Sequence, residues 1–215
     1  MRVKEKVIIF DFDGTIVNSS KAIMNAFNAI AEKYGLKKLG SLEDFKELYE
    51  GNVYEGIISR GLNKERLNEF FDDWRLPLLD ENAEIKLING MKEVIAILEK
   101  NNKLCVITSN SDAYVEKLLE KFGILGIGVV LGGNVNHSKV AKIKMIIKKY
   151  GKREYYYVGD TAGDMIEAKK AGIRAIGVSW GVHSHEMLEK SGADFVADGP
   201  EELLGILGSK NFKCD

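Results

Sequence analysis

The sequence predicts an α/β fold: a doubly wound, mostly parallel sheet with an all-helical segment inserted after the first strand. From residue 87 onward, short apolar runs alternate with amphipathic patterns, which is typical of parallel strands joined by crossover helices. Residues 16–86 break this alternation, because they show helical periodicity only. We therefore expect an α/β core over residues 1–15 and 87–215 and a separate helical domain over residues 16–86.

The first strand is the apolar run Val7-Ile8-Ile9-Phe10, which leads directly into Asp11-Phe12-Asp13-Gly14-Thr15. Side chains alternate along an extended chain, so Asp11 and Asp13 can face the same side, where two carboxylates either repel each other or share a cation. Ligands bind outside the carboxyl ends of strands in open α/β sheets, so this segment is the first candidate site. The alternative is an acidic surface turn, since Asp and Gly are common turn residues.

The inserted segment shows no convincing strand. Gly51, Gly56 and Gly61 interrupt it and predict turns between short helices that stand over the carboxyl edge of the sheet. Its apolar residues recur at helical spacing near both ends, at Ala22, Ala26, Ala29 and Ile30, and then at Phe70, Phe71 and Trp74.

The remainder of the chain supplies the other elements of the core. We expect strands at residues 103–107, 127–131, 154–158 and 173–178. The helical patterns cover residues 91–101, 114–122, 140–150 and 165–171, and residues 203–207 predict a closing helix.

The second strand runs into Thr108-Ser109-Asn110-Ser111. Hydroxyl groups and backbone amides at the end of a strand, just before a helix, can bind an anion. The alternative is a helix cap formed by Ser111 or Asp112, and both can hold at once if Thr108 faces the site.

A lysine-rich helix follows the third strand. Ser138 is a good N-cap, which puts Lys139 in the first turn, where a cation opposes the helix dipole. A lysine in this unfavourable place is a candidate for binding an anion, and Lys142 is the second candidate. The other lysines of this helix are expected to form a solvated face.

The fourth strand ends in Gly159-Asp160-Thr161-Ala162-Gly163-Asp164. Asp160 falls at the strand terminus and Asp164 four residues later, so both side chains can point the same way at a helix start. The alternative is that these acids only stabilise the helix N-terminus. With Asp11 and Asp13, however, four carboxylates would converge on one edge of the sheet, and such a cluster favours Mg²⁺.

The order of these parts resembles the haloacid dehalogenase-like hydrolase superfamily over nearly the whole chain. The helical insertion is similar to the C1-type cap of that superfamily, and the chain as a whole is most similar to its phosphoglycolate phosphatase-like members. The resemblance implies a Rossmann-like catalytic core and a Mg²⁺-dependent phosphatase that acts on a small phosphorylated metabolite.

The expected chemistry assigns a role to each motif. Asp11 attacks phosphorus to form an aspartyl-phosphate, and Asp13 serves as general acid and then as general base. Asp11, Asp13 (through its backbone carbonyl), Asp160 and Asp164 are the expected metal-site residues, with Asp164 orienting Lys139 or a metal-bound water. The expected phosphate-binding residues are Gly14, Thr15, Thr108, Ser109, Asn110 and Lys139. Arg60, Lys46 and Tyr54 are candidates for contacts with the leaving group, with ordinary surface roles as the alternative.

Two rival functions remain open. A phosphomutase would use the same residues and return the phosphoryl group to the substrate. A signalling receiver domain also phosphorylates an Asp beside Mg²⁺, but receivers are shorter and place that Asp on a middle strand.

Composition excludes several other classes. Lys and Arg total 31 against 32 Asp and Glu, so there is no basic excess for nucleic-acid binding. No run of 18 apolar residues predicts a membrane span. Cys105 and Cys214 suggest neither a disulfide framework nor a metal site, so we expect a cytoplasmic protein. We expect this protein to be either a monomer or a homodimer.

Overall fold

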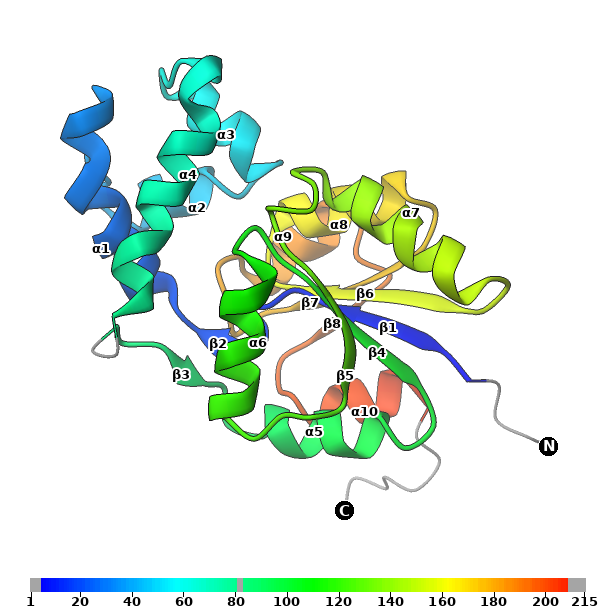
Figure 1. Cartoon of the computed structure of the whole chain (residues 1–215). Helices are drawn as coiled ribbons and strands as arrows, with labels where there is room; N and C mark the ends of the chain where they lie inside the picture. Colours follow the sequence, from blue (N-terminus) through cyan, green and yellow to red (C-terminus); the bar gives the residue numbers. More distant parts are fainter. Residues whose placement is uncertain (1–4, 81–82, 209–215) are drawn as a thin grey trace.

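The computed structural model describes residues 5–80 and 83–208, and its core is one parallel sheet of six strands (Figure 1). The strand order is β5-β4-β1-β6-β7-β8, and every neighbouring pair is parallel. This arrangement confirms the predicted fold class. The strands are β1 (Val7–Phe10), β4 (Lys103–Ile107), β5 (Ile127–Leu131), β6 (Tyr155–Gly159), β7 (Arg174–Val178) and β8 (Phe195–Ala197).

Helices cover both faces of this sheet because side chains alternate along each strand. In β1, Ile8 and Phe10 belong to one apolar cluster, whereas Val7 and Ile9 belong to the other. The first face packs against α5 (Met91–Leu98), α6 (Asp112–Lys121) and α10 (Glu202–Ile206). The second face packs against α7 (Lys139–Tyr150), α8 (Ala162–Lys170) and α9 (His185–Lys190).

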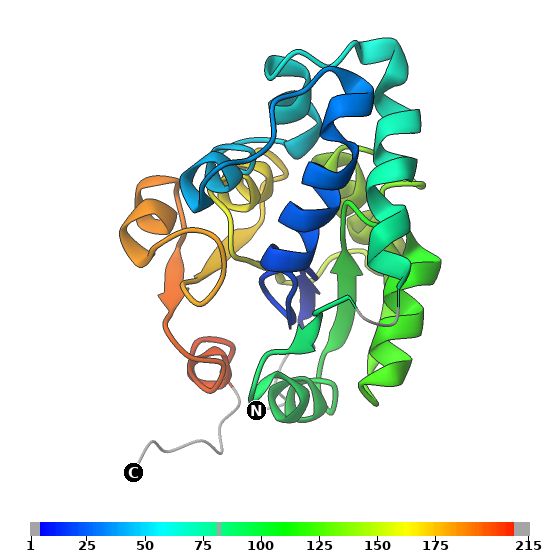
Figure 2. The same cartoon turned by 90° about the vertical axis from the view of Figure 1, so that its left-hand side faces the viewer.

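The segment after β1 folds into helices that lie beyond the ends of the core strands (Figures 1 and 2). Edge-to-face contacts among aromatic rings help to hold them together, with Phe27 against Phe70 and Trp74 at centroid distances of 5.9 and 5.4 Å. We call this helical layer the cap. Its helices are α1 (Ser20–Ile30), α2 (Leu42–Glu47), α3 (Val53–Ser59) and α4 (Leu67–Arg75), with 3₁₀ turns at Ala31–Tyr34, Lys64–Arg66 and Leu76–Leu79.

The expectation of a strand-free insertion is wrong at its two ends. Strand β2 (Val17–Asn18) pairs antiparallel with β3 (Lys86–Leu87) where the chain enters and leaves the cap. Two-residue strands show no period in a sequence, and this pair depends on segments that are far apart along the chain. The extent of the cap, residues 16–86, stays a prediction.

Most core elements agree with the sequence to within a few residues. The predicted ranges 103–107 and 127–131 match β4 and β5, the range for β6 is displaced by one residue, and the range for β7 begins one residue early. Helix α9 and strand β8 were not predicted, since both are short and carry little periodicity. Cys105 is buried in β4, whereas Cys214 lies outside the described residues.

The strand order places a candidate ligand site at the carboxyl end of β1. This strand lies between β4 and β6, and the connections on its two sides run over opposite faces of the sheet. A ligand crevice forms at such a switch point, at the carboxyl ends of the strands. Among the helices within the described ranges, none combines the length and apolar character needed to cross a bilayer.

Candidate active site

Three buried carboxylates meet at the carboxyl ends of β1 and β6. Asp11 follows β1, Asp160 follows β6, and Asp164 lies in the first turn of α8; one oxygen of each lies within 4.8 Å of the others. Burial raises the pKa of Asp160 to about 7, and repulsion from Asp164 adds to this effect. Burial also raises the pKa of Asp11, although Lys139 opposes it. Carboxylate oxygens so close together suit a hard cation such as Mg²⁺.

Backbone and hydroxyl donors fix the orientation of the two later acids. The Val182 N–H donates to Asp160 Oδ2 at 2.8 Å, and the Thr161 hydroxyl donates to Asp164 Oδ2 at 2.7 Å. Thr161 also caps α8, since its hydroxyl accepts from the Asp164 N–H at 3.1 Å. Asp164 therefore takes part in a capping box and in the acidic cluster at once.

Two glycines leave the space that Asp160 occupies. A Cβ at Gly14 would lie 2.0 Å from Asp160 Oδ2, and a Cβ at Gly181 would lie 2.3 Å from the same oxygen. Gly14 also has a φ of 76°, which side-chain-bearing residues rarely adopt. Any larger residue at either position would displace the Asp160 carboxylate.

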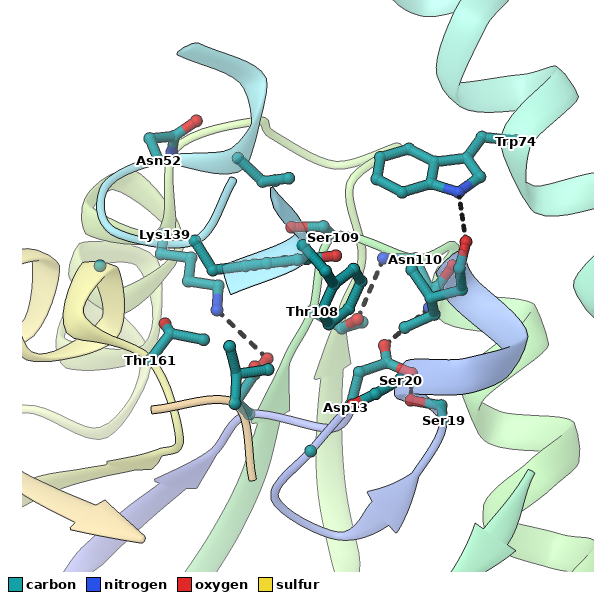
Figure 3. A pocket seen from close by; sticks show the side chains of 18 of the residues that line it. Asp13, Ser19, Ser20, Asn52, Trp74, Thr108, Ser109, Asn110, Lys139 and Thr161 are labelled. Atoms are coloured by element: carbon teal, nitrogen blue, oxygen red, sulfur yellow. Dashed lines mark hydrogen bonds and ion pairs between the residues drawn. The ribbon is translucent and has the colours of Figure 1, made fainter. Parts of the chain in front are cut away.

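Lys139, the first lysine candidate, lies against the acidic cluster. Its Nζ is 3.2 Å from Asp11 Oδ1 and 2.6 Å from Asp164 Oδ1 (Figure 3 shows it beside the pocket). Burial alone would lower the pKa of Lys139, but the two carboxylates outweigh burial and hold the pKa well above its ordinary value. The predicted N-cap is also present, because Ser138 Oγ accepts from the Ala141 N–H at 3.2 Å.

Lys142, the second lysine candidate, occupies a different place. Its side chain is fully buried, and Nζ donates to the Thr108 carbonyl at 2.6 Å and to the Gly132 carbonyl at 3.4 Å. Burial lowers the pKa of Lys142 to about 7. Lys139 therefore contacts the carboxylates, whereas Lys142 supports the backbone after β4.

The segment after β4 reaches the site and holds Asp13. The Asn110 amide donates to Asp13 Oδ2 and the Ser19 hydroxyl donates to Asp13 Oδ1, both at 2.7 Å (Figure 3). Burial raises the pKa of Asp13 despite these two hydrogen bonds. Both oxygens of the Asp13 carboxylate therefore accept hydrogen bonds from residues other than the three clustered acids. The role of the Asp13 backbone carbonyl as a metal ligand stays a prediction.

Thr108, Ser109 and Asn110 all line the same pocket as Asp11, Asp13, Gly14 and Lys139. Thr108 is fully buried, and its hydroxyl accepts from the Asn110 N–H at 3.0 Å. Thr15 donates to Asp160 Oδ1 at 3.4 Å. Ser111 caps α6 through the Tyr114 N–H, as the alternative reading of this segment allowed.

The cap candidates divide into two groups. The Tyr54 hydroxyl donates to the Ser109 carbonyl at 3.3 Å, and its ring stacks on His137 at 4.2 Å. Lys46 pairs with Glu43 and Arg60 pairs with Glu47, so the structure does not bring Lys46 or Arg60 to the pocket wall.

Three further residues join the cap to the core. Arg75 Nη2 donates to the Ser109 carbonyl at 2.8 Å, and the Asn52 amide donates to Glu167 Oε1 at 3.1 Å. The same Glu167 oxygen accepts from the Lys139 N–H at 3.2 Å. These residues, like Val182, lie outside the recognisable motifs, and only the three-dimensional fold reveals that they meet at the site.

Known proteins resemble this chain in sequence. The model of the family described as haloacid dehalogenase-like hydrolase matches residues 8–178. A phosphoglycolate phosphatase from Synechococcus elongatus is 26% identical over 204 residues, which cover 93% of this chain and 95% of the relative.

Solved structures share the fold. A protein from Clostridium acetobutylicum, described as a predicted phosphatase, aligns with a TM-score of 0.83 and 20% identity, covering 95% of this chain and 99% of its own. A haloacid dehalogenase-like hydrolase from Streptococcus pneumoniae aligns with a TM-score of 0.77 and 20% identity, covering 94% and 98%.

Proposed function

Because the chain belongs to the haloacid dehalogenase-like hydrolase family, we propose that it is a Mg²⁺-dependent phosphatase that hydrolyses a small phosphate monoester through an aspartyl-phosphate. The observation that carries this proposal is the position of Asp11 beside Asp160, Asp164 and Lys139. The receiver-domain alternative does not fit this family. Relatives named phosphoglycolate phosphatase make phosphoglycolate the first substrate to assay.

The residues fit a magnesium ion, since three buried carboxylates crowd together with a single lysine ammonium against them. Asp11, Asp160 and Asp164 would hold the ion, and the Asp13 carbonyl is a further expected ligand. When bound, the ion neutralises the negative charge shared by the carboxylates and the phosphate.

Asp11 is the proposed nucleophile. One of its oxygens forms a bond to phosphorus while the bond between phosphorus and the ester oxygen breaks. Lys139 supports this step by offsetting charge on Asp11 and on the transferring oxygens. Thr108 and the amides that follow it are proposed to hold the remaining phosphate oxygens.

Asp13 is the proposed general acid and base. Its raised pKa favours a protonated carboxyl group, which can donate its proton to the departing alkoxide. The resulting carboxylate then takes a proton from the water that attacks phosphorus, and Asp11 leaves as a free carboxylate. Ser19 and Asn110 hold the Asp13 side chain in place throughout.

The first test is phosphate release from p-nitrophenyl phosphate and phosphoglycolate, with Mg²⁺ and with EDTA. We expect activity with Mg²⁺ only, and Asp11→Asn should lower kcat by about three orders of magnitude or more, as loss of a covalent nucleophile does. Glu116→Gln, at an exposed position on α6, is the control and should retain activity. Substantial turnover by Asp11→Asn would rule out the covalent route.

A second arm separates hydrolysis from the phosphomutase alternative. A phosphomutase would return the phosphoryl group to a sugar phosphate, so added sugar phosphate would suppress release of inorganic phosphate and yield an isomer. We expect free phosphate to account for all of the ester consumed.

A further inference from the structure

The pocket above Asp11 has two chemically different walls. The core supplies the polar wall that contains Asp11, Asp13, Thr108 and Lys139. The cap supplies a wall that is mainly apolar and aromatic, and Trp74 lies on that side in Figure 3. Its main side chains are Ile23, Phe45, Val53, Phe71, Trp74 and Leu78, all of them buried.

A cation on the cap wall could pair with a negatively charged leaving group. Among the described cap residues that line the pocket, Arg75 is the only lysine or arginine. Its Nη1 pairs with Asp72 at 3.0 Å and its Nη2 donates to the Ser109 carbonyl, whereas its Nε has no hydrogen-bond partner among the described residues but is buried where a substrate cannot contact it. Arg75 is therefore already used to join the cap to the core.

The other cations cannot take this part. Lys139 is held between Asp11 and Asp164 at the polar wall. Lys46 and Arg60, the cap cations expected to contact the substrate, pair with glutamates away from the pocket wall. Glu167 also lines the pocket and adds negative charge.

The neutral polar side chains of the cap that line the pocket are those of Ser19, Ser20, Tyr49 and Asn52. A carboxylate placed against the apolar part of this wall would lose its water without gaining a charged partner, which is unfavourable. An apolar group there would remove its own surface and that of the wall from water, which is favourable. Resting on the phosphatase function proposed above, we propose that the substrate is a phosphate monoester whose leaving alcohol is uncharged and largely apolar. Phosphoglycolate, whose leaving group carries a carboxylate, is then a poor substrate.

Wild-type kinetics test this directly. Benzyl phosphate and phosphoglycolate are both esters of primary alcohols, so they differ at the cap wall rather than in the bond that breaks. With Mg²⁺ present, we expect kcat/KM for benzyl phosphate to exceed that for phosphoglycolate by at least about tenfold, as pocket contacts of this kind allow. A smaller ratio, or a preference for phosphoglycolate, overturns the proposed substrate class.

A matched pair of variants in one turn of the cap assigns the preference to this wall. Leu78 lines the pocket, whereas Leu76 is 61% exposed two residues earlier. Leu78→Ala should lower kcat/KM for benzyl phosphate by about fivefold or more while phosphoglycolate changes little, because only the apolar contact is removed. Leu76→Ala should change neither value. Equal losses for both esters in Leu78→Ala would contradict a specific contact.

The outcomes also separate this proposal from the one on which it rests. Phosphate release from phosphoglycolate but not from benzyl phosphate keeps the phosphatase and removes the apolar leaving group. Absence of release from both esters and from p-nitrophenyl phosphate removes both proposals.

Discussion

Asp13 illustrates how much of the site depends on the environment of single residues. Its carboxyl group is held by Ser19 and Asn110, and burial raises its pKa, which is the direction that the proposed role as an acid requires. Asp11, two residues earlier, is held by Lys139 instead. Two acids of one short motif thus have different partners and are suited to different roles.

This difference leads to a prediction about leaving groups. Asp13→Asn should lower kcat for alkyl phosphates by about 10²–10⁴-fold, the usual contribution of general acid–base catalysis. Release of p-nitrophenolate in the first turnover should be affected much less, since that leaving group needs no proton. Stopped-flow measurement of the first turnover checks this, and an equal loss for both ester types would argue against an acid role.

Lys142 predicts a dependence of stability on pH. Its pKa is lowered from 10.5 to about 7, so the folded protein binds fewer protons than the unfolded chain between these values. The contribution of Lys142 to the free energy of unfolding therefore rises with pH across this window and is least favourable below it.

Urea unfolding at about pH 6.5 and about pH 9.5 measures this contribution. Relative to the wild type, Lys142→Met should be more stable at the lower pH than at the higher one. Lys144→Met, an exposed position on the same helix, should show the same difference from the wild type at both values. A pH-independent effect of Lys142→Met would contradict the assignment.

The site depends on loops that approach one another closely after β1, β6 and β7. Gly181 lies in the loop after β7, at a position where a Cβ would collide with Asp160. We expect Gly181→Ala to weaken Mg²⁺ binding by about tenfold or more, comparable with loss of an outer-shell contact of a metal ligand.

Isothermal titration with Mg²⁺ measures this effect, and Gly205→Ala is the control. Gly205 lies in α10, where a Cβ would meet no atom within 4 Å. The control should bind Mg²⁺ like the wild type and gain slightly in stability, since alanine favours helices. Unchanged Mg²⁺ affinity in Gly181→Ala would show that the loop can adjust.

The sequence predicted those parts of the site that lie at strand ends within recognisable motifs. Asp11 and Asp160 were predicted together because the carboxyl ends of parallel strands share one edge, and Lys139 was a candidate because a cation in the first turn of a helix opposes the helix dipole. Val182 was not, because it acts through a backbone N–H that any residue would provide. Arg75 and Glu167 were missed because their contacts cross between the cap and the core, and no local pattern specifies that docking.

Polar contacts help to dock the cap against the core, beside the apolar cluster that the two share. Asn52 caps α3 and also reaches Glu167 and the His137 carbonyl, and the Gly163 N–H donates to the Tyr49 carbonyl at 3.1 Å. These bonds close the pocket on the side of α8. We expect this docked arrangement to exclude water from a bound phosphate ester.

Asn52→Ala should therefore raise KM several-fold, because the docked arrangement becomes less populated. Asn63→Ala is a matched control, since Asn63 caps the turn at Lys64–Arg66 within the cap through the Glu65 N–H. Both variants lose one hydrogen bond to the N-terminus of a helix or turn, which lowers the free energy of unfolding by about 1 kcal/mol. Steady-state kinetics measure the effect on docking of the cap, and thermal unfolding measures the effect on its stability. A rise in KM for both variants would mean that cap stability alone is responsible.

The paired strands β2 and β3 have a further consequence. Val17 lies opposite Leu87 and Asn18 opposite Lys86, so the chain leaves the core and returns to it at one point. The insertion is consequently attached to the core strands in the same way, whatever structure lies between residues 18 and 86. We expect that an insertion of another size or shape, ending in the same two-residue ladder, can be exchanged at this junction while the strands that carry the aspartates keep their spacing.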